Sequence, residues 1–191
     1  MIQAEFVVSA LAARDFPSDG LPEVALAGRS NIGKSSLINR LAKNRSLART
    51  SSKPGKTRSI NFYRFDRSFY IVDLPGYGYA KAGKELARKW QTATEQYFRN
   101  RPAIALVIQL VDARMSPTAL DFQLAEWLQH WKISRLLVAT KADKLSGNQL
   151  TSNQRMISEA LGEDRIIMSS AVTGMGNKEI WARMLSVTQN R

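Results

Sequence analysis

The chain of 191 residues contains no cysteine and a single histidine, His130. The absence of cysteine excludes disulfides, thiolate nucleophiles and cysteine metal sites, and no cluster of metal ligands accompanies His130. Long apolar runs are also missing. The longest, residues 103–111, is interrupted by Gln109 and is far shorter than the roughly 20 residues that span a bilayer. The N-terminus lacks the basic start and apolar run of a signal peptide, so we expect a cytoplasmic protein without a membrane partner.

Acidic residues are scarce. Sixteen Asp and Glu face 28 Lys and Arg, and the formal net charge is +12. No acidic residue occurs between Val24 and Phe65, where ten basic residues lie, and a second basic group follows at positions 81–89. Such a balance favours a nucleic-acid or anionic-membrane partner. RNA is favoured because no basic helix shows a strongly apolar opposite face. A cationic surface that only keeps the chain soluble is the alternative.

The stretch Gly28-Arg29-Ser30-Asn31-Ile32-Gly33-Lys34-Ser35 matches the phosphate-binding P-loop pattern G-x-x-x-x-G-K-[ST]. Its glycines let consecutive backbone N–H groups point at phosphate oxygens. Lys34 can reach the β- and γ-phosphates, and the Ser35 hydroxyl can ligate Mg²⁺. An apolar run, 24–27, precedes the loop, and a helix-like segment follows it. This order aims a helix N-terminus at an anion.

Apolar runs alternate with helix-like segments along the rest of the chain. This order predicts one α/β domain over residues 1–191, with a mostly parallel central sheet, helices on both faces and ligands at the carboxyl ends of the strands. The polar stretch 44–59 is expected to be a mobile loop. The expected strands are 6–8, 24–27, 60–66, 68–72, 104–111, 135–139 and 166–168, and the expected helices are 34–42, 86–97, 120–131, 153–161 and 176–187.

Three further motifs stand at the ends of expected strands. Asp73-Leu74-Pro75-Gly76 offers an aspartate that can hold Mg²⁺ through water and a glycine N–H for a γ-phosphate. Thr140-Lys141-Ala142-Asp143 offers a carboxylate for the two N–H donors of guanine and a lysine stem for the purine face. The backbone N–H groups of Ser169-Ser170-Ala171 could donate to the guanine carbonyl oxygen. Both arrangements reject adenine.

Together these motifs resemble the translation-factor-related P-loop GTPases, in the branch of Era and EngA, and more closely the EngB family. The stretches GRSNIGKSSLIN from Gly28, PGKTRSINFY from Pro54 and DLPGYGYA from Asp73 carry the resemblance over nearly the whole chain. It implies a Ras-like GTPase domain that hydrolyses GTP to GDP, acts in assembly of the large ribosomal subunit and supports cell division and septation. The implied partners are GTP or GDP and a precursor of the large subunit or its rRNA, and we expect a monomer.

The resemblance also assigns roles that spacing alone does not. Thr57 aligns with the switch threonine that joins the Mg²⁺ shell in the GTP state. Residues 55–59 would then belong to switch I and residues 73–83 to switch II. Thr140 replaces the more common asparagine of NKxD, which leaves Asp143 to select guanine.

Tyr77 stands where Ras-type enzymes place the glutamine that orients water, so intrinsic hydrolysis should be slow. A partner or a monovalent cation would then help. Asn31 matches an asparagine that related GTPases use to hold K⁺ beside the phosphates, although it could simply stabilise the loop.

The predicted catalytic residues are Lys34, Thr57 and Asn31, and the predicted magnesium ligands are Ser35, Thr57 and, through water, Asp73. The predicted RNA contacts are Arg45, Arg49, Lys53, Lys81, Lys84 and Arg88. The predicted GTP contacts are Gly28, Arg29, Ser30, Asn31, Ile32, Gly33, Lys34, Ser35, Gly55, Lys56, Thr57, Arg58, Ser59, Asp73, Leu74, Pro75, Gly76, Thr140, Lys141, Ala142, Asp143, Ser169, Ser170 and Ala171.

Two other functions compete with this hypothesis. A small P-loop kinase would fit the length and the P-loop, but it would need an acceptor site and an arginine-rich lid. It would not need the motifs at residues 140–143 (TKAD) and 169–171 (SSA). A GTP-dependent scaffold could instead act directly on division or membrane proteins, with little RNA contact. Co-sedimentation with ribosomal subunits in GTP and in GDP discriminates between the scaffold and the ribosomal switch.

Overall fold

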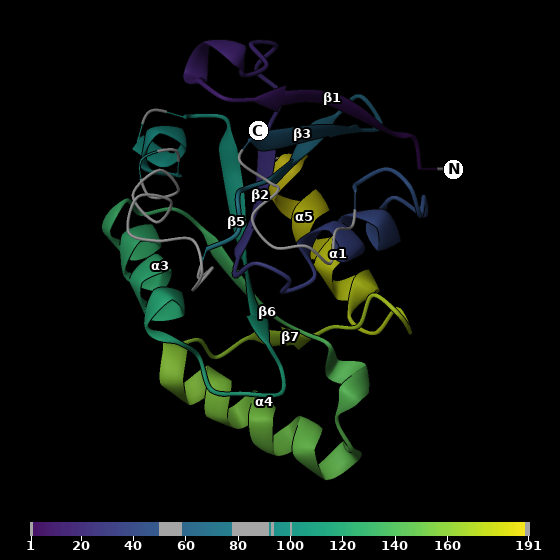
Figure 1. Ribbon diagram of the computed structural model, residues 1–191, viewed down its shortest axis with the longest axis vertical. Coiled ribbons are helices and arrows are strands. Elements are labelled where there is room, and N and C mark those ends of the chain that lie inside the picture. Colours follow the sequence, from purple (N-terminus) through teal and green to yellow (C-terminus); the bar gives the residue numbers. More distant parts are fainter. Residues whose placement is uncertain (1, 50–58, 78–91, 93, 100, 190–191) are drawn as a thin grey trace.

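The computed structural model describes residues 2–49, 59–77, 92, 94–99 and 101–189. In this part of the chain, seven strands form one sheet in the order β1-β3-β4-β2-β5-β6-β7, with helices on both faces (Figure 1). The pairs β1–β3 and β3–β4 are antiparallel, and the remaining neighbours are parallel. The elements are β1 (Ala4–Ala10), a 3₁₀ turn η1 (Ala13–Asp15), β2 (Glu23–Gly28), α1 (Lys34–Leu41), β3 (Ile60–Phe65), β4 (Phe69–Asp73), β5 (Ile104–Asp112), α3 (Ala119–His130), β6 (Arg135–Thr140), a 3₁₀ turn η2 (Ala142–Lys144), α4 (Gly147–Leu161), β7 (Ile166–Met168) and α5 (Asn177–Thr188).

The core lies on both faces of the sheet because successive side chains of a strand point to opposite sides. Leu136 and Val138 of β6 pack with α1 and α5 on one face. Leu137 and Ala139 pack with α4 and part of α3 on the other. β5 is buried at all nine positions, which explains its near-continuous apolar sequence, since a central parallel strand meets helices on both sides.

Most expected elements are confirmed. β3 and β4 form the expected hairpin, and its turn residues Asp66 and Arg67 both have positive φ values, 47° and 55°. β1 is the expected edge strand. The expected helix 86–97 falls mainly on residues outside the described ones, although residues 94–99 are helical. No helix among the described residues is long and apolar enough to cross a membrane.

The start of α4 was predicted wrongly. The helix begins at Gly147 rather than at residue 153. Ser146 is its N-cap, and the Gln149 side chain accepts hydrogen bonds from the Ser146 N–H and hydroxyl, both at 3.0 Å. This capping box stabilises a helix start whose first three residues, Gly147-Asn148-Gln149, carry no apolar side chain, so apolar periodicity alone placed the start too late.

The parallel strands bring their carboxyl ends to one edge of the sheet. Asp73 of β4 lies beside Leu26 of β2. Asp112 of β5 lies beside Thr140 of β6, and Met168 of β7 lies beside Ala139. The loops that follow these strands therefore meet, as the α/β prediction requires.

Candidate nucleotide-binding site

The P-loop connects the end of β2 to the start of α1. Its conformation needs glycine twice. A Cβ at Gly28 would lie 2.9 Å from the Leu110 carbonyl oxygen, and Gly33, the N-cap of α1, has a φ of +112°. Asn31 also has a positive φ, 61°, and is exposed at the loop surface. The loop therefore leads into a helix N-terminus that is open to an anion.

Lys34 opens α1 and is buried. Its ammonium donates to the Gly28 carbonyl oxygen at 3.4 Å, and among the described residues no carboxylate lies within 4.0 Å of it. Burial lowers the pKa of Lys34, and the negative charge of Asp73 opposes that shift. A buried cation without a paired anion favours binding of an anionic ligand such as a phosphate.

Asp73 and Ser35 present oxygen atoms next to Lys34. The Ser35 hydroxyl donates to Asp73 Oδ2 at 3.4 Å, while the buried Oδ1 has no hydrogen-bond partner. Burial raises the pKa of Asp73, and Lys34 and Ser35 act in the opposite direction. No cluster of three or more His, Cys, Asp or Glu occurs among the described residues. An orphaned carboxylate oxygen beside a hydroxyl fits Mg²⁺, which proteins bind through one or two such groups together with phosphates and waters.

Residues 76 and 77 lie directly against the P-loop. Ser30 N donates to the Tyr77 carbonyl oxygen at 2.8 Å, and Tyr77 N donates to the Gly28 carbonyl oxygen at 3.3 Å. A Cβ at Gly76 would lie 2.8 Å from Ser30 N and 3.0 Å from Lys34 Nζ. Only glycine allows this close approach, so the segment after Asp73 is in contact with the phosphate cradle.

The Tyr77 side chain belongs to the core cluster that includes Leu124 and Leu128 of α3. Tyr77 is 3% exposed, and its hydroxyl donates to Asp121 Oδ1 of α3 at 2.7 Å. Burial and the Asp121 charge raise the pKa of Tyr77. Asp121 in turn accepts from the Thr118 N–H and hydroxyl, each at 2.7 Å. The hydroxyl at the position of the Ras-type glutamine therefore has a partner of its own.

The end of β6 lies against the P-loop. The Thr140 hydroxyl, buried at 6% exposure, is 2.7 Å from the Ile32 carbonyl oxygen and 3.1 Å from that of Val111. It thus connects the loop expected to face phosphate with the loop expected to face the base. This contact supports the position of the P-loop, and the predicted contact of Thr140 with GTP stays a prediction.

The two loops expected to contact guanine also meet. Asp143 Oδ1 accepts a hydrogen bond from the Ser170 hydroxyl at 2.7 Å, and this bond is the main cause that lowers the pKa of Asp143. Ser169 N and Ser170 N already donate to the carbonyl oxygens of Ala139 and Met175. The role of the Ser169, Ser170 and Ala171 N–H groups toward the guanine carbonyl oxygen stays a prediction.

Several predicted residues lie outside the described ones. They include four switch I positions and most of the predicted RNA contacts: Gly55, Lys56, Thr57 and Arg58, and Lys53, Lys81, Lys84 and Arg88. Ser59 is described and donates to Asn61 Oδ1 at 3.2 Å. Arg45 and Arg49 are exposed at the protein surface.

The first part of the predicted mobile loop is fixed to α1. The buried Asn39 side chain donates to the carbonyl oxygens of Arg45 and Ala48, at 3.0 and 2.9 Å, and accepts from Ala48 N at 2.6 Å. These bonds connect residues 45 and 48 to α1, while the mobility expected for residues 44–59 stays a prediction.

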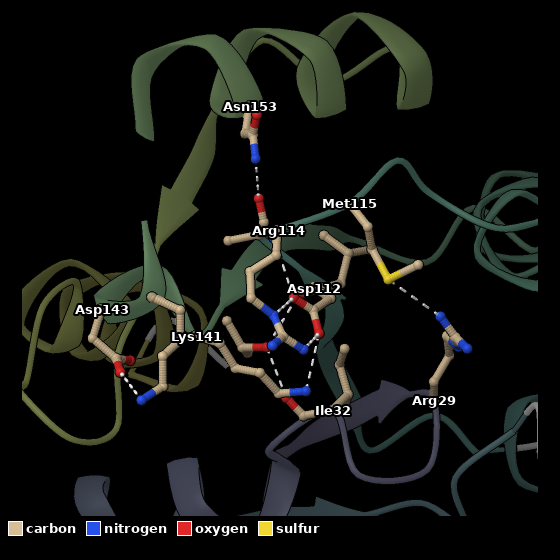
Figure 2. A network of polar contacts seen from close by, with 12 residues as sticks. Arg29, Ile32, Asp112, Arg114, Met115, Lys141, Asp143 and Asn153 are labelled. Atoms are coloured by element: carbon tan, nitrogen blue, oxygen red, sulfur yellow. Dashed lines mark hydrogen bonds and ion pairs between the residues drawn. The ribbon is translucent and has the colours of Figure 1, made fainter. Parts of the chain in front are cut away.

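Asp112 was missed by the sequence predictions. It ends β5 at the same edge and binds two cations, Arg114 and Lys141 (Figure 2). The sequence pattern that would have found Asp112 is present, because Asp112 follows the apolar run 104–111 just as Asp73 follows the apolar run 69–72.

Comparison with known proteins places these features in a family. Residues 23–141 match the family model described as "50S ribosome-binding GTPase". The chain is 49% identical to "Probable GTP-binding protein EngB" of Heliobacterium modesticaldum, over 93% of this chain and 88% of that protein. It is 46% identical to the protein of the same name in Geobacillus kaustophilus, over 96% and 95% of the two chains.

Solved structures share the fold. A crystal structure of a probable GTP-binding protein engB superimposes with a TM-score of 0.73, at 23% identity, and covers 88% of this chain and 100% of that chain. Aquifex aeolicus Era, a Y63A variant bound to GDP·AlF₄⁻, gives a TM-score of 0.70 at 20% identity, with 88% of this chain and 57% of that chain covered.

Proposed function

This chain belongs to the EngB family of GTP-binding proteins, and from that premise we propose that it is a GTPase switch acting in assembly of the large ribosomal subunit. In this proposal GTP orders the switch segments, the ordered protein binds a pre-ribosomal particle, and hydrolysis to GDP releases it. In the same proposal, normal cell division and septation depend on this step of subunit assembly.

One contact supports the assignment of GTP most directly. The Thr140–Ile32 hydrogen bond, at 2.7 Å, joins the loop with the phosphate-binding pattern to the loop that carries Asp143. Asp143 is held by Ser170 and has a lowered pKa, so it remains an acceptor for the two N–H donors of guanine. Adenine lacks that pair of donors, which disfavours the alternative of an ATP-dependent kinase.

The groups at the proposed phosphate end of the site support the binding of GTP. We infer that Lys34 binds the β- and γ-phosphates and that Gly76 N–H contacts the γ-phosphate. Ser35 and Asp73, joined at 3.4 Å, would hold Mg²⁺, with Thr57 joining them in the GTP state. When bound, Mg²⁺ neutralises charge on the phosphate oxygens. Lys34 supplies the second positive charge at the same place.

Turnover by this site should be slow without help. The Tyr77 hydroxyl is engaged by Asp121, and a phenol cannot position water as an amide does. We propose that the ribosomal partner, K⁺ held by Asn31, or both supply the missing stabilisation. Asn31 is exposed at the P-loop, on a left-handed backbone, and in this proposal its side chain holds the ion beside the phosphates.

The proposed partner follows from family and charge. The matching family model carries the description of a 50S ribosome-binding GTPase, and the chain has a formal net charge of +12. Arg45 and Arg49 are exposed cations, and we propose that they contact rRNA with Lys53, Lys81, Lys84 and Arg88. The protein would then act in the cytoplasm, as a monomer.

The test is co-sedimentation with purified large ribosomal subunits. A non-hydrolysable GTP analogue should increase the bound fraction severalfold over GDP, and Lys34→Ala should bind equally in both. Equal binding of the wild type in both nucleotides would contradict the switch, and no binding in either would contradict the ribosomal partner.

A further inference from the structure

The Asp112 carboxylate at the end of β5 accepts four hydrogen bonds from Arg114 and Lys141. Oδ1 accepts from Arg114 Nε at 2.8 Å and from Arg114 N at 3.1 Å. Oδ2 accepts from Arg114 Nη2 at 2.9 Å and from Lys141 Nζ at 2.9 Å. The Asp112 side chain is only 6% exposed. One carboxylate thus binds a guanidinium bidentately and an ammonium at the same time, as Figure 2 shows.

The loop after Asp112 is itself held in place. Ala113 N donates to the Thr140 carbonyl oxygen at 2.9 Å, and Asn153 Nδ2 of α4 donates to the Ala113 carbonyl oxygen at 2.8 Å. Although burial alone would raise the pKa of Asp112, the hydrogen bonds from Arg114 and Lys141 hold it below its usual range. Asp112 is therefore a fixed and ionised anchor.

The group that this anchor orders is Lys141. Its backbone is left-handed, with a φ of 63°, and it caps the turn η2 that contains Asp143. A free lysine side chain has about 2 kcal/mol of rotamer entropy. A lysine whose aliphatic stem lies against a purine loses much of this rotamer entropy when nucleotide binds, unless the protein has already ordered the side chain.

We propose that Asp112 is a positioning residue of the guanine pocket: it holds the Lys141 ammonium so that the aliphatic stem is ordered against the purine face before nucleotide binds. This inference rests on the proposed function, in which Lys141 and Asp143 contact guanine. Arg114 holds the Asp112 carboxylate in the orientation that Lys141 needs.

The proposal predicts that loss of Asp112 weakens nucleotide affinity through the contact with the base. Immobilising one long side chain costs about 0.5–1.5 kcal/mol, which corresponds to roughly 2- to 13-fold in affinity. Asp112→Asn should therefore raise the Kd of GTP and of GDP by the same factor, about three- to tenfold. The factor is the same because both nucleotides carry the same base.

A double-mutant cycle separates positioning from a general structural effect. Lys141→Met keeps an apolar stem but removes the ammonium that Asp112 binds. If Asp112 acts through Lys141, Asp112→Asn should cost no further affinity in the Lys141→Met background. Equal cost in both backgrounds would show that Asp112 only supports the fold.

The measurement is fluorescent GDP and GTP-analogue titration, with melting temperatures of the nucleotide-free variants. A Kd of Asp112→Asn within twofold of wild type overturns the inference. Should that variant fail to fold, Lys141→Met alone must show the three- to tenfold loss, and an unchanged Kd would overturn it. Wild type without preference for guanine over adenine nucleotides would instead refute the proposed function itself.

Discussion

Removing the Tyr77 hydroxyl separates a structural role from a catalytic one. The bond from Tyr77 to Asp121 Oδ1 is 2.7 Å long, and both residues are buried, at 3% and 2% exposure. A hydrogen bond to a charged group contributes about 1.5–3 kcal/mol. Tyr77→Phe leaves Asp121 Oδ1 without this donor, so we expect a loss in the upper part of that range.

For a chain of this length, each kcal/mol shifts the melting temperature by about 2–4 °C. Tyr77→Phe should therefore melt roughly 4–12 °C lower, measured by thermal denaturation at saturating GDP for both proteins. Its GTP hydrolysis rate should stay within about threefold of wild type, because the hydroxyl donates to Asp121 of α3.

Tyr70→Phe is the matched control. It removes a bond of the same length, 2.7 Å, to Asp19. Asp19 is exposed and can be solvated when the phenol is lost, so the cost should be smaller. A hundredfold loss of hydrolysis by Tyr77→Phe, with unchanged melting temperature and GTP affinity, would refute the structural role and make the hydroxyl catalytic.

The remaining predictions concern the base, the cation, the basic face and the core. Asp143→Asn should weaken GTP binding and shift preference toward xanthosine triphosphate, in competition titrations; unchanged GTP selectivity would contradict the role of Asp143. K⁺ should stimulate hydrolysis more than Na⁺, and Asn31→Ala should remove that difference, whereas a difference that persists in the variant would place the ion elsewhere. Reversal of Lys81 and Lys84 to Glu should weaken binding to large subunits, with a shallower salt dependence and intact GTP affinity. The exposed Lys178 on α5, changed to Glu, is the control, and equal loss in both would indicate a non-specific charge effect. Glu23→Gln should destabilise the protein by about 3–5 kcal/mol, because it leaves the largely buried Arg101 without its charged partner; a urea midpoint equal to wild type would show that this pair is not formed.

The edge of the sheet that forms the site could be predicted because it depends on local patterns. An apolar run followed by a polar motif identifies a strand end, and parallel strands bring such ends together. Asp73 and Asp143 were found in this way, and both lie at that edge in the structure. The same pattern is present at Asp112, but the proposed role of Asp112 depends on its contact with Lys141, which is 29 residues away in the chain.

Contacts between distant residues could not be predicted in this way. Tyr77 and Asp121 are 44 positions apart, and nothing near either residue specifies the other. Asn39 looked like one polar residue on an amphipathic helix, yet its amide holds three backbone groups of the following loop. Such bonds satisfy buried polar groups, and they become visible only when the packing is known.

The contacts of the P-loop connect it to two other parts of the protein. Ile32 meets Thr140 on the base side, and Ser30 and Gly28 pair with Tyr77 on the side of the predicted switch II. Tyr77 continues through its hydroxyl to Asp121 and hence to α3. Because Gly76 has no room for a side chain against Ser30 and Lys34, a group that enters beside Lys34 cannot move this segment without affecting the Tyr77 contacts. In the proposed switch, this close packing and the bond to Asp121 favour Tyr77 as a link between the P-loop and α3 rather than as the residue that activates water.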